Sequence, residues 1–244
     1  MESVSDSAPL YPFLAPPRGY AVDPYRAIEF SSTANDCVTV TARRAIGGSI
    51  SRVFKFSWYK SDTVVDGIRA LSKEMGVRGL RSLSMTLNTA RRSDPMLSPT
   101  TWLDDFGAAH QLKMLQAAGR AGMTLCMLLS ASIEDGTWQR GGATGGAIVW
   151  PKLYRLKLEL VPLAHRFSQE DGVEEDDESF GVSVGEVLLR ELERRQERGA
   201  PLSRLKLLRC GATRHWLRKA EGLVGCVSAA GDEDMSEGEE SGGA

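Results

Sequence analysis

Apolar residues repeat one spacing four times along the chain. In each copy, leucine or another apolar residue stands at the first, fourth and sixth positions, and most residues between them are polar. The copies begin at Leu80, Leu112, Leu153 and Leu202. Alternation of this kind is typical of a β-strand that buries one face. Each copy therefore predicts a strand whose apolar side chains point into a shared core.

The segments between these copies predict helices. Residues 53–58 (VFKFSW) alternate like a further strand, and residues 61–76 then place apolar side chains at spacings of three and four, as a helix with one buried face does. Ser183 and Glu186 have the spacing of a capping box, in which each side chain satisfies a backbone N–H at the start of a helix. Thr213 is placed to cap a last short helix. Strand and helix thus alternate along the chain.

The spacing matches the leucine-rich repeat, L-x-x-L-x-L-x-x-N/C, in which the leucines face a continuous core and each unit needs stacked neighbours to bury its apolar side. The last position favours Asn or Cys because a small polar group there meets backbone groups at the turn. It is Asn88 after the first copy and Cys210 after the fourth, but Arg120 and Val161 after the second and third. We therefore expect an α/β fold, a short irregular leucine-rich-repeat solenoid with a mainly parallel sheet. The alternative is an ordinary α/β sheet whose core strands are rich in leucine.

Composition divides the chain into three parts. Residues 1–30 are rich in proline and lack periodicity, which predicts an extended or disordered lead-in. Residues 36–228 carry the repeats, and within them residues 168–180 are so acidic that we expect an exposed insertion. Residues 229–244 are acidic and nearly free of apolar side chains, so we expect a disordered tail.

The segment at residues 184–227 resembles the C-terminal end of fungal F-box proteins, especially those of the large basidiomycete group. There, a helix ending in an R..RGAPL phrase leads into L.RL.L..C and a short final helix, and the same phrases stand here at residues 195–202 and 202–210. Three further phrases fit the earlier repeats of such proteins: FSW at residues 56–58, LRSLSMTL at 80–87 and WPKLYRLKLEL at 150–160. The resemblance covers residues 38–227. It implies an irregular leucine-rich-repeat domain that serves as the substrate-recognition half of a ubiquitin-ligase receptor.

The chain departs from this family at its N-terminal end. An F-box would read like LPxEILxxIF, in a helical segment that docks a Skp-family adaptor, and residues 1–40 contain no such sequence. The resemblance therefore implies a non-catalytic protein–protein interaction module, with a Skp-family adaptor as a partner only if a cryptic F-box is present. A stand-alone repeat scaffold unrelated to ubiquitination is the alternative.

No pattern in the sequence indicates catalysis, a cofactor or a metal. The three histidines, His110, His165 and His215, have neither metal-ligand spacing nor a neighbouring nucleophile motif. The GGATGG at residues 141–146 lacks the GK[ST] of a phosphate-binding loop. The acidic run at residues 170–178 lacks the alternating ligands and central glycine of an EF-hand. We therefore expect no enzyme, no cofactor and no metal site.

The sequence predicts an intracellular protein, in the cytoplasm or nucleus. No apolar run reaches the roughly 18–20 residues that span a bilayer, and the N-terminus lacks the features of a secretory signal. Cys37, Cys126, Cys210 and Cys226 are far apart, which indicates reduced and mostly buried thiols. The net charge of −2 gives no general attraction to nucleic acid or to a membrane.

In a repeat solenoid, the polar positions that alternate with the core residues line the open face of the sheet. The candidate partner-binding residues at such positions are Ser82, Ser84, Thr86, Arg155, Lys157, Arg204 and Lys206. Along the chain this face changes from hydroxyl-rich to basic, which predicts a groove for an acidic segment of a protein partner because arginine pairs well with carboxylates. The alternative is that exposed strand residues are simply polar and that the cationic ones keep sheet edges from pairing.

Two further hypotheses concern charge. The acidic run at residues 170–178 follows the third copy, and we expect it to fold over Arg204 and Lys206 as an internal competitor. The basic segment Arg190–Lys219 suggests nucleic-acid binding, but glutamates stand among its arginines, and mixed charges favour pairs within a helix over contacts with phosphates. Nucleic acid is therefore the less favoured partner.

Overall fold

The computed structural model of the chain describes residues 25–32, 37–46, 49–59, 68–69, 72, 77–86, 99–130, 132–134, 137–139, 148–167 and 181–231. Its centre is an eight-stranded sheet in the order β10-β9-β8-β5-β4-β1-β2-β3. The strands are β1 (Tyr25–Ser32), β2 (Cys37–Ile46), β3 (Ser49–Tyr59), β4 (Ser82–Thr86), β5 (Met114–Ala118), β8 (Arg155–Glu159), β9 (Arg204–Leu208) and β10 (Val227–Ala230). A separate small hairpin consists of β6 (Ser132–Glu134) and β7 (Thr137–Gln139).

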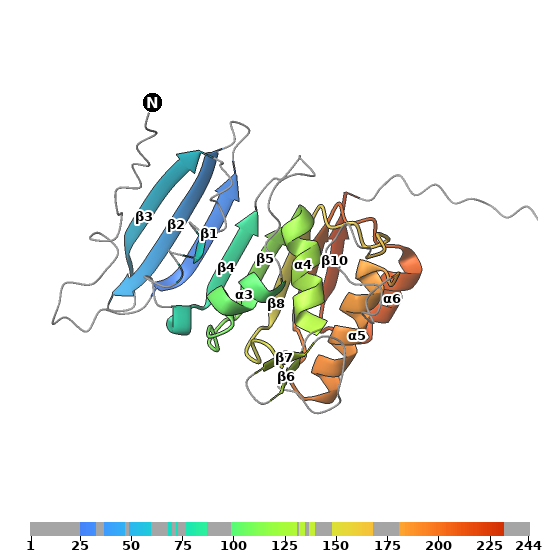
Figure 1. Cartoon of the computed structure of the whole chain (residues 1–244). Coiled ribbons are helices and arrows are strands. Elements are labelled where there is room, and N and C mark those ends of the chain that lie inside the picture. Colours follow the sequence, from blue (N-terminus) through green and yellow to red (C-terminus); the bar gives the residue numbers. More distant parts are fainter. Residues whose placement is uncertain are drawn as a thin grey trace, which may run out of the picture.

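The sheet is mainly parallel, and its parallel strands follow the order of the chain. The strands β1, β4, β5, β8, β9 and β10 pair in parallel, whereas β2 and β3 extend the sheet beyond β1 as antiparallel strands. A parallel pair needs a connection that crosses one face of the sheet. The helices lie together on one face (Figure 1): α3 (Pro99–Phe106), α4 (Gly119–Ser130), α5 (Val184–Glu197) and α6 (Arg214–Glu221), preceded by the 3-10 turn η1 (Val77–Gly79). The expected α/β class with a mainly parallel sheet is thus confirmed.

The four copies of the leucine spacing occupy equivalent positions in this sheet. The fourth residue of each copy forms one row across the strands, which runs Leu83, Leu115, Leu156, Leu205. The sixth residue forms a second row, which runs Met85, Ala117, Leu158, Leu207. Each of these side chains is at most 2% exposed. One continuous apolar layer therefore lies between the sheet and the helices, as the spacing predicted.

Two more copies of the spacing lie at the two ends of the parallel part of the sheet. Tyr25, Ile28 and Phe30 are buried, and Ile28 and Phe30 continue the two rows on β1. At the other end, Val224, Val227 and Ala229 have the same spacing on and before β10. The sheet therefore begins before the expected boundary at residue 36, and β10 extends past the expected boundary at residue 228.

The strands of the later copies end in the same backbone turn. The residue directly after β5, β8, β9 and β10 has a positive φ in each case: 54° at Gly119, 55° at Leu160, 52° at Arg209 and 84° at Gly231. This conformation is costly for residues with a Cβ, so its recurrence at Leu160 and Arg209 shows that the turn is imposed by the fold. At the next position, the Cys210 sulfur lies 3.5 Å from the carbonyl oxygen of Leu158 and 3.4 Å from that of Leu208, so its single S–H hydrogen can be donated to either. This is the role expected for the Asn/Cys position.

The expected helix caps are present. The Ser183 hydroxyl accepts a hydrogen bond from the backbone N–H of Glu186, and the Glu186 carboxylate accepts one from the N–H of Ser183, so the capping box of α5 is complete. Thr213 caps α6 through the N–H of Trp216. Of the helix expected at residues 61–76, Ile68, Arg69 and Ser72 are described and helical. Asn88, the glycine-rich segment at 141–146 and the acidic insertion at 168–180 lie outside the described residues.

Candidate partner-binding surface

The candidate surface is the face of the sheet opposite the helices. Its side chains alternate with the buried rows, and they are exposed or half-buried where the core residues are not. The seven residues expected to bind a partner, Ser82, Ser84, Thr86, Arg155, Lys157, Arg204 and Lys206, all lie on this face. The helices of the described chain lie on the other side (Figure 1). We call this surface the open face.

Four cations form a compact block on the open face. Arg155 of β8 is in register with Arg204 of β9, and Lys157 of β8 is in register with Lys206 of β9. Neighbouring strands lie about 4.8 Å apart, and residues two apart along a strand about 6.6 Å. Like charges directly opposite each other in a sheet are destabilising. The fold therefore tolerates an unfavourable arrangement here, which an anionic ligand would relieve.

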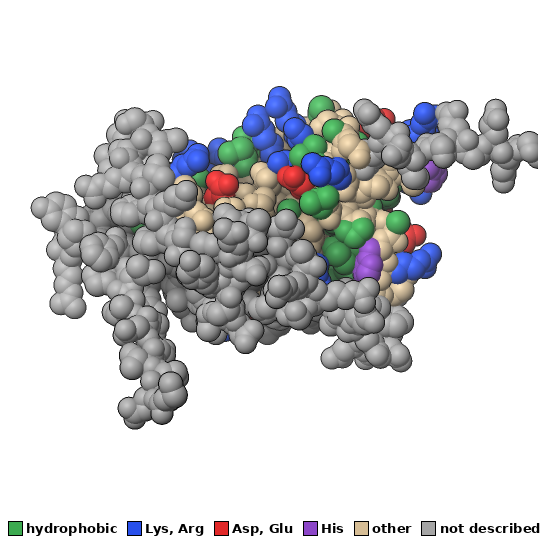
Figure 2. Space-filling view, turned by 90° about the horizontal axis from the view of Figure 1, so that it is seen from above, with side chains coloured by type: hydrophobic (Ala, Val, Ile, Leu, Met, Phe, Trp, Pro, Cys, Tyr) green, Lys and Arg blue, Asp and Glu red, His purple; other side chains and the backbone are tan. Residues whose placement is uncertain are grey.

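Among the described residues, only part of this positive charge is neutralised. The Lys157 ammonium lies 3.2 Å from the Glu159 carboxylate, and the Arg155 guanidinium lies over the Tyr154 ring, 5.2 Å from its centre. Arg204 and Lys206 are exposed, and neither takes part in an ion pair with another described residue. The surface as a whole carries mixed charge: Figure 2 shows Lys and Arg side chains gathered along the upper edge of the molecule with acidic side chains among them.

The hydroxyl-rich half of the open face is less available than the sequence suggested. The Thr86 hydroxyl donates to the carbonyl oxygen of Phe30 at 3.3 Å, so its hydrogen is already used. Between the hydroxyl-rich and basic halves lies β5, which contributes Met114, 37% exposed, and Gln116. Both residues were missed as candidate binding residues, although they hold the same alternating positions in the second copy. Met114 adds an apolar contact beside Arg155, with which it is in register.

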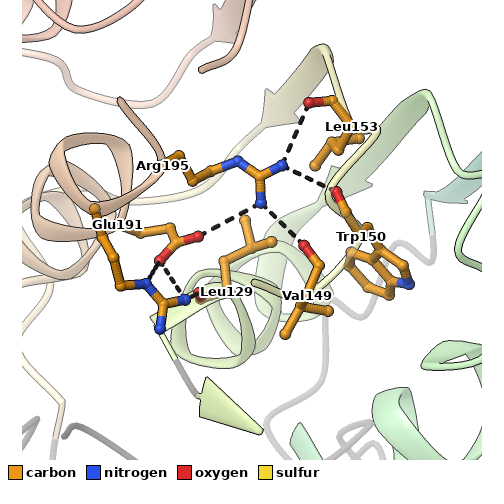
Figure 3. Close-up of polar contacts among 7 residues, drawn as sticks. Leu129, Val149, Trp150, Leu153, Glu191 and Arg195 are labelled. Carbon is orange, nitrogen blue, oxygen red and sulfur yellow. Dashed lines mark hydrogen bonds and ion pairs between the residues drawn. The ribbon is translucent and has the colours of Figure 1, made fainter. Parts of the chain in front are cut away.

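A second group of charged residues is buried on the helix side, and its role is different. The Arg195 guanidinium donates to the carbonyl oxygens of Val149, Trp150 and Leu153, over 3.0, 2.9 and 3.3 Å (Figure 3). It also lies 3.5 Å from the Glu191 carboxylate. Both side chains are 1% exposed. Arg195 is the first residue of the R..RGAPL phrase, so this contact gives that arginine a structural role.

The same carboxylate binds a second arginine. The Arg194 Nε donates to Glu191 over 2.7 Å, and its terminal nitrogen donates to the carbonyl oxygen of Leu129 at the end of α4. Burial raises the pKa of Glu191 to about 7, against the opposing attraction of Arg194 and Arg195. Shifted pKa values are frequent in active sites, but a substrate cannot reach a carboxylate that is 1% exposed. We interpret the group as a clip that joins α5 to α4 and to the turn before β8.

The described residues show no second kind of site. His110 and His215 are exposed and His165 is half-buried, and within the described part of the chain no three His, Cys, Asp or Glu side chains gather as a metal would require. In the described part of the chain, Cys126, Cys210 and Cys226 form no disulfide; Cys126 and Cys210 are buried and Cys226 is exposed. Among the described helices, none has the length and apolar character needed to cross a membrane.

Comparison with known proteins gives no relative: no protein-family model matches the chain, and neither the curated proteins nor the solved structures contain a significant match.

Proposed function

We propose that this chain is a non-catalytic protein–protein interaction module, a short irregular leucine-rich-repeat solenoid that binds an acidic segment of a partner protein on its open face. The observation that supports this function most directly is the block of four cations, in register on β8 and β9, on a face that the described helices leave uncovered. Arginine guanidinium groups pair with carboxylates through two parallel hydrogen bonds. An extended acidic segment lying across the two strands would place carboxylates beside both rows.

Three observations support the solenoid. The parallel strands follow chain order without a reversal, whereas doubly wound α/β sheets reverse their strand order at the point where they bind ligands. The core rows are in register from β1 to β10. The turn with positive φ recurs after four strands. Stacked units of this kind use their exposed sheet for binding, because each unit contributes one strand to it.

The proposed biological context is substrate recognition for ubiquitin ligation, and it rests on the resemblance of residues 38–227 to fungal F-box proteins. A pull-down of the chain from cell extract, probed for a Skp-family adaptor and ubiquitin-ligase subunits, tests this context. Recovery of the adaptor supports the receptor function. Reproducible recovery of other proteins without the adaptor supports the alternative, a stand-alone scaffold with the same open face.

Binding itself is tested with a fluorescent peptide rich in Asp and Glu, titrated with the protein at low salt and followed by anisotropy. Reversing two charges with Arg204→Glu and Lys206→Glu should weaken binding by about tenfold or more, since each factor of ten corresponds to about 1.4 kcal/mol. The matched control, Arg190→Glu with Arg218→Glu, changes the net charge equally at exposed positions on α5 and α6. Equal loss in both variants would show attraction to overall charge and would contradict a site on the open face.

A further inference from the structure

Helix α6 presents a second cationic surface, separate from the open face. Its apolar side is fixed to the core: Trp216 and Ala220 are buried, and the Trp216 indole N–H donates to the carbonyl oxygen of Gly185 at 2.8 Å. The side chains of Arg214, Arg218 and Lys219 are exposed. We call these three residues the cationic side of α6. Arg218 and Lys219 lie in the last turn of α6, where basic residues also favour the C-terminal dipole of the helix.

The last strand, β10, contacts α6 and ends at Ala230. Gly231 follows β10 with a φ of 84°, in the position that Arg209 holds after β9. The Arg209 N–H donates to the carbonyl oxygen of Ala230 at 2.9 Å, and a Cβ at Gly231 would lie 2.7 Å from the Cγ of Arg209. The side chain of Arg209, which is exposed, therefore lies across the point where the last segment begins.

The turn at this point has a consistent direction in the preceding copies. After Gly119 the chain enters α4 directly, after Leu160 it buries Val161, and after Arg209 it buries Cys210 before α6 begins. Each of these routes leads from the sheet toward the helix layer rather than toward the open face. Gly231 holds the equivalent position after β10, with a φ of 84°.

The segment that follows, residues 232–240, is strongly acidic. It carries six carboxylates and no Lys or Arg: Asp232, Glu233, Asp234, Glu237, Glu239 and Glu240. An extended chain spans up to roughly 3.3 Å per residue, whereas a helix rises about 1.5 Å per residue. Residues 232–240 are therefore long enough to follow the whole of α6, which has eight residues.

We propose that the acidic segment at residues 232–240 binds the cationic side of α6 within the same chain. Charge complementarity, the length of the segment and the position of Arg209 at its start support this contact. Individual exposed ion pairs are weak, but a tether of a few residues gives an effective concentration in the millimolar range, so several weak pairs suffice. The contact covers the cations that would otherwise attract polyanions, and it does not depend on the partner site proposed for the open face.

A spin label on the segment tests the contact in the full chain. Ser236→Cys carries the label, and Cys37→Ser with Cys226→Ser removes the competing thiols, while Cys126 and Cys210 are buried. Amide resonances of α6 should lose intensity through proximity to the label, and those of β8 and β9 should not. Raising the salt concentration should restore the α6 intensities, because exposed ion pairs are screened over about 8–10 Å at moderate ionic strength.

Two charge variants complete the design. Arg218→Gln with Lys219→Gln should reduce the loss of intensity along α6, and Arg204→Gln with Lys206→Gln should leave it unchanged. The spectra of both unlabelled variants verify that the fold is retained. Intensity loss centred on β8 and β9 would place the segment on the open face and overturn the proposal. Intensity loss at neither surface would overturn it as well.

Discussion

The guanidinium of Arg195 donates a hydrogen bond to the carbonyl oxygen of Trp150 at 2.9 Å, joining α5 to the turn that opens the third copy of the repeat. Trp150 has a positive φ of 48°, and its indole N–H donates to the carbonyl oxygen of Phe106 at the end of α3. A chain of polar contacts thus runs from α3 through Trp150 to α5. In stacked repeats, distant units have no contacts with one another. In the proposed solenoid, links of this kind between successive units therefore determine whether the chain unfolds as one body.

Removing the Arg195 guanidinium should destabilise the fold strongly. Arg195→Met leaves three buried carbonyl oxygens without this donor and leaves Glu191 with one arginine fewer. Breaking a buried charge pair in this way typically costs about 3–5 kcal/mol. Urea denaturation of the variant measures the loss, and Arg190→Met, at an exposed position of the same helix, should change stability by less than about 0.5 kcal/mol. Similar values for the two variants would show that the clip adds no stability.

The stability that depends on Glu191 should decrease as the pH rises. Burial raises the pKa of Glu191 from 4.5 to about 7, so the folded state binds the proton more tightly than the unfolded state does. Because the pKa of Glu191 is raised in the folded state, the stability that its protonation contributes is complete below about pH 4.5. This stability is lost progressively as the pH rises to about 7. The difference in unfolding free energy between the native chain and Glu191→Gln should therefore fall across this window. A difference that grows with pH would mean that the two arginines dominate over burial.

The recurring turn predicts opposite effects at two equivalent positions. Gly119 has space around it for a Cβ, so Gly119→Ala should cost about 1 kcal/mol through the positive φ alone. Leu160 has the same φ and is 45% exposed, so Leu160→Gly should be neutral or stabilising. Thermal denaturation of the two variants measures both changes. If Leu160→Gly destabilised the chain as much as Gly119→Ala, the two turns would not be equivalent.

The acidic insertion at residues 168–180 should weaken binding at the open face. Its two ends are joined, because the Gly181 N–H donates to Phe167 at 2.9 Å and the Phe167 N–H donates to Val182 at 3.1 Å. A short Gly-Ser linker can therefore replace the insertion without separating β8 from α5. If the insertion competes for Arg204 and Lys206, its replacement should raise the affinity for an acidic peptide several-fold in the anisotropy titration. An unchanged affinity would show that the insertion does not compete with the peptide for these cations.

The sequence predicted the middle of the sheet better than its ends. The leucines at fixed spacing predicted four strands and one buried face, because burial of one side of a strand requires that alternation. The first strand was not predicted because aromatic and β-branched residues replace leucine at Tyr25, Ile28 and Phe30, directly after a proline-rich segment. The last strand was missed because the residues that continue the two rows, Val227 and Ala229, are small and are half-buried and exposed, respectively. Residues 25–32 and 227–230 are recognisable as strands only from their pairing with neighbouring strands. The local sequence pattern carries no information about that pairing.

The buried arginine was missed although its position carries a signal. Leu188, Leu192 and Arg195 follow the spacing of four and three that marks one face of a helix. All three are buried. A charged residue that continues an apolar stripe needs buried partners, and here they are carbonyl oxygens of a segment more than forty residues away. Composition alone presents Arg195 as one of many charged residues on α5, most of them exposed.

An NMR titration with an acidic peptide tests the binding surface most directly. Unlabelled peptide is added at low salt, and the amide resonances of the protein are followed residue by residue. We expect the largest shifts on β8 and β9, at and around Arg155, Lys157, Arg204 and Lys206, with the helix layer little changed. Shifts confined to α5 and α6, or none at peptide concentrations that saturate the anisotropy signal, would contradict a partner site on the open face.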